Sequence, residues 1–515
     1  MAFYEKFRGC KEKNFGIDSV NRMIFFHFLK GLVKKMITFL IGLVILFAGA
    51  SIYGKFCENV VRPTNATTPA IKLRDGVDFV PIPKWRAALI ELLKIAGPGP
   101  VLGPIQGILF GPIAFLTIPV GCVLGGAVHD YFSGMISMRN NGEQMPALIK
   151  RFLGGNIYFV YNIFVCLLML LVGTVFIYTP GDLFTSQILG DDASTLNSTV
   201  VMVYGGIFIY YLAATLFPID KIIGKVYPIF GAVLLLSAVG IFFGLFIHGY
   251  PLSEVWDVGI FDIHPAGEHF IPIFFVTVAC GIVSGFHSTQ ATMIARTVTS
   301  EHQGRMIFYN AMIAEGFIAM SWAAATMGII NSGIIDVTTV QKSAVLVVGI
   351  VAKDLLGTVG GMVAVLGVIV LAITSGDTAL RSLRIMIGDS LNMDHRKKRN
   401  ILSLSAIIFA IVAAVLYFAK TDAQGFAILW RYFAWANETI AVFAFAMISV
   451  YMMKKSMPYL IALIPGTFYM YIISSYILHA KIGLGFDWII AYVAAGILSV
   501  LYAGLIIKFG KKNNL

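Results

Sequence analysis

The stretch LLKIAGPGPVLGPIQG, Leu92 to Gly107, lies inside a hydrophobic run long enough to cross a membrane. Seven of its sixteen residues are Gly or Pro, the two poorest helix formers. A single Pro would be explained by a kink that neighbouring helices tolerate. The bilayer core holds no water, so a broken helix survives there only where protein or a polar cavity satisfies its backbone groups. The series Gly97, Pro98, Gly99 and Pro100 therefore favours a functional break near the membrane midplane.

The composition is that of a polytopic membrane protein embedded in a lipid bilayer. The 515 residues are 58% hydrophobic and 13% charged, whereas soluble domains carry about 25% charged residues. The net charge of +11 does not indicate nucleic-acid binding, because Lys and Arg cluster in short loops between apolar runs. The five cysteines have neither metal-ligand nor redox spacing. We expect no metal and no cofactor beyond a coupling ion.

Segments of about 20 apolar residues predict an all-α protein with thirteen transmembrane helices. The predicted spans are 36–54, 86–108, 112–138, 155–179, 199–217, 226–248, 270–297, 305–329, 357–388, 401–419, 428–453, 457–478 and 485–508. A short interfacial or loop helix is expected at Ser343 to Leu355.

The distribution of charge predicts the orientation. Connections after the odd-numbered spans, with the C-terminus, hold most of the Lys and Arg, so they are expected in the cytoplasm. Connections after the even-numbered spans carry acids instead: Asp182, Asp191, Asp192, Glu254, Asp257, Asp262 and Glu268. Parity then puts the N-terminus outside, although residues 1–35 carry eight Lys and Arg. Either this segment is tethered unusually, or a span is hidden around Met23 to Val33, or translation starts at Met36, which we favour.

A second interruption is predicted in the seventh span, which holds Ser284, Gly285, His287 and Gln290 in a polar patch. Five spans separate the start of the second span from the start of the seventh, so the two interrupted helices run antiparallel. Two groups of five spans, each opening with an interrupted helix, are typical of inverted-repeat secondary transporters. We therefore divide the chain into an uncertain basic segment (1–35), an extra helix (36–54), a first repeat (86–248), a second repeat (270–453) and two further helices (457–508).

The two breaks define the expected substrate site. A half-helix that starts near Val101 points free N–H groups and the positive end of its dipole at the midplane, which favours a carboxylate. The carbonyls that end the preceding half-helix, around Ile95 to Gly97, could hold a cation. A small-molecule carboxylate with a coupled cation is the natural pairing.

Polar groups inside spans are the candidates for ion coupling, because charge at membrane depth is costly and usually functional. Thr374, Ser375 and Asp377 offer hard oxygen ligands, while Arg381, four residues after Asp377, equally fits a structural ion pair. Glu315 is a single carboxylate in an apolar setting that protonation or a partner must neutralise.

Two further candidates have open alternatives. Asp130 follows His129, which suits a proton relay or a satisfied interhelical hydrogen bond. Lys94 precedes the first break, where it could pair with a substrate carboxylate, replace a bound sodium, or extend toward the interface. Asn437 and Glu438 lie deep in the eleventh span and are less easily dismissed than the aromatic residues around them.

Seven segments together carry a resemblance to a known family. They are TPAIKLRDGVDFVP (68–81), IAGPGPVLGP (95–104), GGAVHDYFSGMISMRNNGE (125–143), FPIDKIIGKVYPIFG (217–231), VTVACGIVSGFHSTQ (276–290), MIAEG (312–316) and SGDTALRSLRIMIGD (375–389). The chain resembles the carbon starvation protein A family of peptide and pyruvate transporters over nearly all of the first eleven spans. The resemblance implies a five-plus-five inverted-repeat, LeuT-like fold in the bacterial inner (plasma) membrane. It places the substrate at Gly97 to Pro100 and Ser284 to Gln290, and the coupling ion at Thr374 to Asp377.

One departure concerns the region before the first break. Longer members carry a His-His pair there, where this chain has Ile90 and Glu91 followed by Lys94. The substrate and the coupling ion of this chain therefore need not be theirs.

The helix breaks predict a secondary transporter that works by proton or sodium symport. The resemblance implies that it imports short peptides or a small carboxylate such as pyruvate during starvation. A peptide would need a second anchor for its ammonium group, with Glu91 or Glu315 as candidates. An intramembrane aspartyl protease would have to pair Asp130 with Asp377, and the helix breaks would have no role, so we expect no enzyme. A nutrient sensor would need an output partner, because the chain has no large cytoplasmic segment. The oligomeric state is left open.

Overall fold

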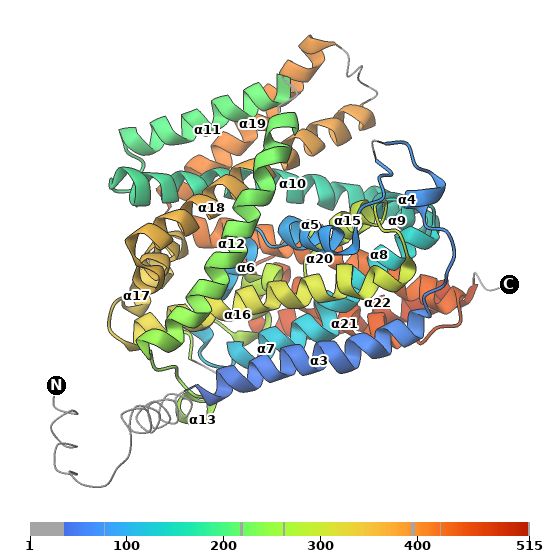
Figure 1. Cartoon of the computed structure of the whole chain (residues 1–515), viewed down its shortest axis with the longest axis horizontal. Helices are drawn as coiled ribbons and strands as arrows, with labels where there is room; N and C mark the ends of the chain where they lie inside the picture. The colour runs from blue at the N-terminus through green and yellow to red at the C-terminus, as the bar shows by residue number, and fades with distance from the viewer. Residues whose placement is uncertain are drawn as a thin grey trace, which may run out of the picture.

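The computed structural model describes residues 36–76, 78–216, 220–260, 263–391, 393, 397–422 and 424–512, and within these ranges it is helical without strands. Figure 1 shows the arrangement of the helices. The first part of the chain forms α3 (Ile37–Val61), α4 (Pro69–Lys72), α5 (Lys84–Ile95), α6 (Gly99–Gly107), α7 (Ala114–Gly121), α8 (Ala127–Arg139), α9 (Met145–Leu153), α10 (Gly155–Leu183), α11 (Ser198–Leu216), α12 (Asp220–His248) and α13 (Val255–Val258). The second part forms α14 (Phe275–Val278), α15 (Gly285–Ile294), α16 (Asn310–Asn331), α17 (Val337–Lys342), α18 (Ala344–Ser390), α19 (Lys398–Thr421), α20 (Gly425–Lys454), α21 (Leu460–His479) and α22 (Trp488–Lys512).

Among the described residues, eleven helices are long and apolar enough to cross a membrane, and twelve if the bent pair α5–α6 counts as one span. A shorter apolar helix covers Ser198–Ala214. The all-helical polytopic class is therefore confirmed, while the count of thirteen spans and the two repeats stay predictions. The short helix expected at Ser343 to Leu355 is the first part of α18, which changes direction at Gly357 (φ 71°, ψ 175°). The expectations for residues 1–35 lie outside the described residues.

The helices differ in how much of their surface the protein covers. In α20, 89% of the most apolar stretch is buried, and in the segments Phe270–Ile294 and Glu301–Asn331 the share is 83%. The corresponding share is only 22% in α22. A helix that is apolar all round is buried in protein or faces lipid. These three segments thus lie at the centre, and α22 lies at the rim.

Contacts at the helix ends group the connecting segments as parity predicts. The carboxylate of Glu254, in the segment after α12, accepts the N–H groups of Ile37 (2.7 Å) and Thr38 (2.8 Å) and so satisfies the free start of α3. Toward the other end of α3, Arg139 at the end of α8 binds Glu301. Glu254 and the start of α3 thus belong to one predicted side, and Arg139 and Glu301 lie in connections of the other.

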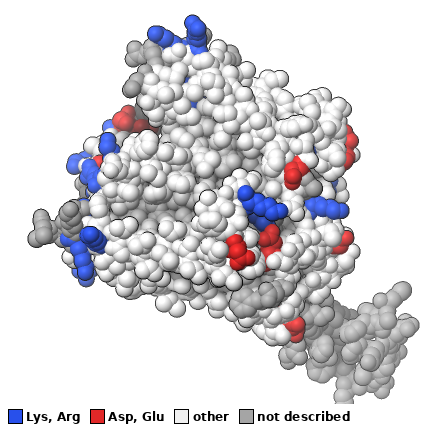
Figure 2. Space-filling model, turned by 180° about the vertical axis from the view of Figure 1, so that it is seen from behind, with Lys and Arg blue, Asp and Glu red and all other residues white. Residues whose placement is uncertain are grey.

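The two ends also differ in charge. Figure 2 shows Lys and Arg gathered mainly at the left and upper edges, most Asp and Glu toward the right, and a broad face without charged side chains between them. Large apolar side chains are exposed on several helices, among them Ile209, Phe243 and Ile247, as contact with lipid tails requires. The charge asymmetry is that of a multi-pass membrane protein, and the cytoplasmic assignment of the basic end stays a prediction.

Candidate functional site

The first interrupted span consists of α5 and α6, whose axes are bent by 52°. Ala96 leaves the helical region (φ −77°, ψ 63°), and the Gly97 N–H donates to the Ile95 carbonyl at 2.8 Å instead of continuing the helical ladder. Pro98 and Pro100 have no N–H to donate and cannot continue that ladder either. The Gly-Pro series therefore breaks the helix where the sequence predicts it.

The start of α6 has fewer free N–H groups than the sequence predicts. The Val101 and Leu102 N–H groups both donate to the Pro98 carbonyl, at 3.2 and 2.9 Å, and Pro100 has no N–H. Among the described residues, Gly99 is thus the one of the first four residues of α6 whose N–H has no hydrogen-bond partner. The expectation of several donors near Val101 is wrong, because Pro98 itself caps the half-helix through its carbonyl.

The second interruption lies at Ile282 to Ser284. Ile282 (φ −127°, ψ −57°) and Ser284 (φ −134°, ψ 124°) depart from helical geometry, and α15 begins at Gly285. The amide of Asn437 on α20 occupies the new helix start. Its Oδ1 accepts the Phe286 N–H at 2.9 Å, and its Nδ2 donates to the Ser284 hydroxyl at 2.9 Å. Asn437 therefore holds the second break in its extended shape.

The two breaks cross in direct contact. A Cβ atom built on Gly99 would lie 2.4 Å from the Cβ of Cys280, and one on Gly103 would lie 3.0 Å from the Thr277 carbonyl oxygen. The absence of side chains at these glycines is what allows α6 to approach the second interrupted span. A Cβ on Gly97 would meet nothing within 4 Å, so open space adjoins the first break at that residue.

Four fully buried ionisable side chains form a chain of contacts beside the second break. His287 on α15 places Nδ1 3.2 Å from Asp130 Oδ2 and Nε2 3.5 Å from Glu315 Oε2. His129 Nδ1 lies 2.8 Å from Asp130 Oδ1. Because an imidazolium donates from both nitrogens, His287 can link the carboxylates of α8 and α16. The sequence points to all four of these groups, with His129, Asp130 and Glu315 as candidates for proton or ion handling and His287 for substrate binding, and the structure brings them together.

Glu91 is a further buried acid beside the first break. It lies one turn before the break and is fully buried on α5, the helix that packs against α15 and α16, which carry His287 and Glu315. Among the described residues, neither oxygen of Glu91 or of Glu315 has a hydrogen-bond partner. Burial of unsatisfied carboxyl oxygens is expensive, and structures keep such groups chiefly where they function. We name Glu91, His129, Asp130, His287 and Glu315 the relay cluster.

A second buried acid lies next to the Asn437 cap. Glu438 on α20 is fully buried, and its oxygens have no hydrogen-bond partner among the described residues. The preceding residue, Asn437, donates to Cys280 Sγ at 3.3 Å, so Glu438 follows directly on a residue at the crossing of the breaks.

The Thr374 to Asp377 segment of α18 forms a separate group. The Thr374 hydroxyl donates to the Val370 carbonyl of its own helix at 2.9 Å. Asp377 pairs with Arg381 at 3.3 Å, and Arg381 also donates to the Ala214 carbonyl at 2.9 Å. These bonds fit the structural ion pair that the sequence left open, and the role of Thr374, Ser375 and Asp377 in coupling stays a prediction.

The remaining predicted residues are partly enclosed. Lys94 is half-buried on α5, and Gln290 is half-buried on α15, where its amide donates to Thr289 at 3.3 Å.

Sequence reasoning missed Lys420, whose ammonium donates to both oxygens of buried Asp182 at 2.8 and 2.7 Å. The signal was a lone lysine at the end of an apolar span, which by itself does not reveal its partner.

The fold is similar to that of solved membrane transporters. A crystal structure of a mutant of the Eremococcus coleocola manganese transporter superposes with a TM-score of 0.53, covering 84% of this chain and 96% of that one at 11% sequence identity. At that identity the likeness concerns the fold alone. The LeuT-like fold expected from the sequence is thereby confirmed.

The sequence identifies the family. The model of the family "Carbon starvation protein CstA" matches residues 34–235, 181–347 and 338–475, so the chain belongs to this family. The named relatives in this family are membrane transporters and not enzymes. The chain is 25% identical over 336 residues to the pyruvate/proton symporter BtsT of Escherichia coli, covering 53% of this chain and 45% of the symporter. It is 22% identical to the peptide transporter CstA of Helicobacter pylori, covering 75% of this chain and 73% of that one.

The match extends over most of a smaller relative. A Haemophilus influenzae membrane protein is 40% identical over 332 residues, which are 56% of this chain and 89% of that protein. By contrast, the chain matches about half of the length of the symporter, and 48% of the peptide transporter CstA of Campylobacter jejuni.

Proposed function

We propose that this chain is a secondary transporter that imports a small carboxylate by symport with a proton. The single observation that carries the proposal is the relay cluster, because it touches both helix breaks. Glu91 lies one turn before the first break, and His287 lies in the first turn after the second. A change in protonation within this cluster would act on both half-helices at once.

The cluster favours protons over sodium as the coupling ion. Its core is an imidazole between two carboxylates, and titration of His, Asp and Glu is the ordinary means of proton relay in pumps and transporters. The Thr374 to Asp377 segment, the alternative coupling site, has its acid paired with Arg381. Sodium coupling through that segment is the competing form of the proposal.

The polar groups at the first break favour a substrate with a single carboxylate. Lys94 precedes the break and the Gly99 N–H follows it, and open space adjoins Gly97 at the break itself. Pyruvate, the substrate in the name of the Escherichia coli relative, needs no more than this. A short peptide would need an acidic side chain to bind its ammonium group. If Glu91 or Glu315 bound that group, the same carboxylate would no longer be free to carry a proton in the relay cluster.

The test compares net uptake with exchange in proteoliposomes that contain only this protein. Glu315→Gln keeps the size of the side chain but removes the titratable group. It should abolish uptake of radiolabelled pyruvate driven by an inward proton gradient while leaving exchange of internal for external pyruvate. Asp257→Asn makes the same chemical change at an exposed carboxylate and should leave both activities unchanged.

Two results would count against this form of the proposal. Loss of gradient-driven uptake in Asp377→Asn but not in Glu315→Gln would move coupling to α18. Absence of pyruvate uptake together with saturable dipeptide uptake would replace the substrate class.

A further inference from the structure

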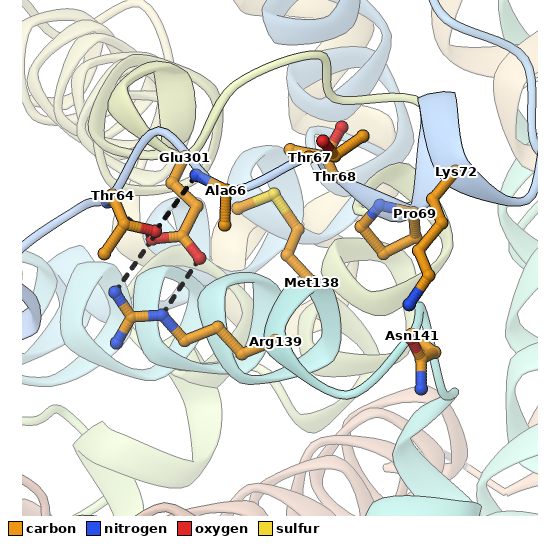
Figure 3. A pocket seen from close by; sticks show the side chains of 10 residues that line it. All are labelled: Thr64, Ala66, Thr67, Thr68, Pro69, Lys72, Met138, Arg139, Asn141 and Glu301. Atoms are coloured by element: carbon orange, nitrogen blue, oxygen red, sulfur yellow. Dashed lines mark hydrogen bonds and ion pairs between the residues drawn. The ribbon is translucent and has the colours of Figure 1, made fainter.

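A cavity of about 360 Å³ opens at the end of the molecule where α3 and α8 finish, away from the helix breaks. Figure 3 shows its lining, drawn from the segment between α3 and α5, the end of α8 and the start of the segment before α16. The lining residues are Thr64, Ala66, Thr67, Thr68, Pro69, Lys72, Met138, Arg139, Asn141 and Glu301. Its volume falls within the range of small-molecule sites, about 300–1,000 Å³.

One wall of this cavity is fixed by a bidentate ion pair. Arg139 donates through Nε to Glu301 Oε1 at 3.1 Å and through Nη2 to Oε2 at 2.8 Å. Glu301 also accepts the Thr64 N–H at 2.9 Å, and Arg139 donates to the Arg62 carbonyl at 3.0 Å. Both carboxylate oxygens of Glu301 are thus hydrogen-bonded within this wall. Among the lining residues, no unpaired negative charge remains to repel an anion.

The opposite wall presents donors. Thr68 is only 2% exposed, and its hydroxyl has no hydrogen-bond partner among the described residues. The Lys72 side chain reaches from α4 toward Asn141, as Figure 3 shows. With Lys72 and Arg139 against Glu301, the lining carries one net positive charge. A buried hydroxyl left unsatisfied is rare in proteins, and a polar ligand that binds there is one of its ordinary explanations.

We propose that this cavity binds a small soluble anion that carries a carboxylate or a phosphate group. The Lys72 ammonium supplies the charge, and the Asn141 amide supplies a directional hydrogen bond to the anion oxygens. The Thr68 hydroxyl, which is enclosed in this structure, becomes a further donor once its side chain turns toward the cavity. Two segments that carry the family resemblance, 68–81 and 125–143, meet here, yet neither the relay cluster nor the helix breaks use these residues. The site is therefore separate from the one proposed for transport.

The test measures binding to the purified full chain in detergent by titration calorimetry, with inorganic phosphate and pyruvate as separate probes. Lys72→Gln and Thr68→Val are the variants, and Lys84→Gln is the matched control because Lys84 is an exposed lysine outside the lining. We expect each cavity variant to weaken binding of at least one probe by about tenfold, the effect of losing one charge-assisted hydrogen bond, and the control to bind as the wild type does.

Proteoliposome uptake separates this site from the transport site. Lys72→Gln should retain gradient-driven pyruvate uptake when substrate is saturating, so loss of anion binding with intact uptake supports the proposal. Equal binding of both probes to wild type, Lys72→Gln and Thr68→Val would overturn it, as would binding of neither probe to the wild type. Because phosphate is not a proposed substrate, failure of pyruvate transport would leave the phosphate result interpretable.

Discussion

The crossing of the two helix breaks predicts that Gly99→Ala is disruptive and that Gly97→Ala is not. At Gly99 the added Cβ would lie 2.4 Å from Cys280 Cβ and 3.1 Å from Cys280 Sγ, closer than carbon atoms pack. Overpacking of this kind costs about 1–3 kcal/mol. At Gly97 the added Cβ meets nothing within 4 Å, and Ala in place of Gly gains about 0.4–1 kcal/mol by restricting the unfolded chain. The free energies of unfolding of Gly97→Ala and Gly99→Ala should therefore differ by about 1.5–4 kcal/mol, although the two positions are only two residues apart.

The assay is unfolding of the purified protein in mixed micelles of increasing denaturing-detergent fraction, with pyruvate uptake measured on the same preparations. Cys280→Gly removes the two atoms that the new methyl group meets. It should restore stability to Gly99→Ala, with a coupling free energy of about 1–3 kcal/mol in the double-mutant cycle. Equal stability of Gly97→Ala and Gly99→Ala, or no recovery with Cys280→Gly, would refute direct contact between the breaks.

Three further variants test the surroundings of the site. Asn437→Leu keeps the volume but leaves the Phe286 N–H unpaired, so it should cost about 1–3 kcal/mol of stability by the same unfolding assay and reduce uptake; unchanged stability would show that the cap is dispensable. Glu301→Gln weakens the bidentate pair with Arg139 and should cost about 1.5–3 kcal/mol, which an unchanged unfolding midpoint would contradict. Burial lowers the pKa of His264 to about 4, and its Nδ1 accepts the neighbouring backbone N–H at 3.2 Å. The unfolded imidazole takes up its proton near pH 6.5, so the folded state should lose stability as the pH falls from about 6.5 toward 4. His264→Phe should lose less over this interval, and parallel pH profiles of the melting temperature would contradict the assignment.

The sequence predicts the broken helices well because the responsible properties are local. Pro98 and Pro100 cannot donate to a helix wherever they occur, and Gly97 adds a flexible link, so the break at Ala96 follows from the residues alone. The long apolar segments likewise specify helices without knowledge of their neighbours. The number of usable N–H groups at α6 is not local in this sense, because it depends on the orientation of the Pro98 carbonyl.

The relay cluster could be predicted only in part. Asp130, Glu315 and His287 stand out in the sequence as polar groups in apolar spans. Asp130 and His287, however, are 157 positions apart in the chain. Spacing along one helix does not report which faces of α5, α8, α15 and α16 meet, so their contacts require the packed structure. The same limit explains why Asp182 and Lys420, 238 positions apart, were not paired from the sequence.

The central claim is proton-coupled transport through the site where the two broken helices meet. Its most direct measurement is the accumulation of radiolabelled pyruvate by proteoliposomes of the purified chain under an imposed proton gradient, with a sodium gradient as the parallel condition. With one proton per substrate, an inward gradient of about one pH unit should drive about tenfold accumulation, since each unit supplies about 1.36 kcal/mol. Glu315→Gln should reduce this ratio to one while exchange continues. Accumulation driven by sodium alone, or a Glu315→Gln variant that accumulates as the wild type does, would contradict the account.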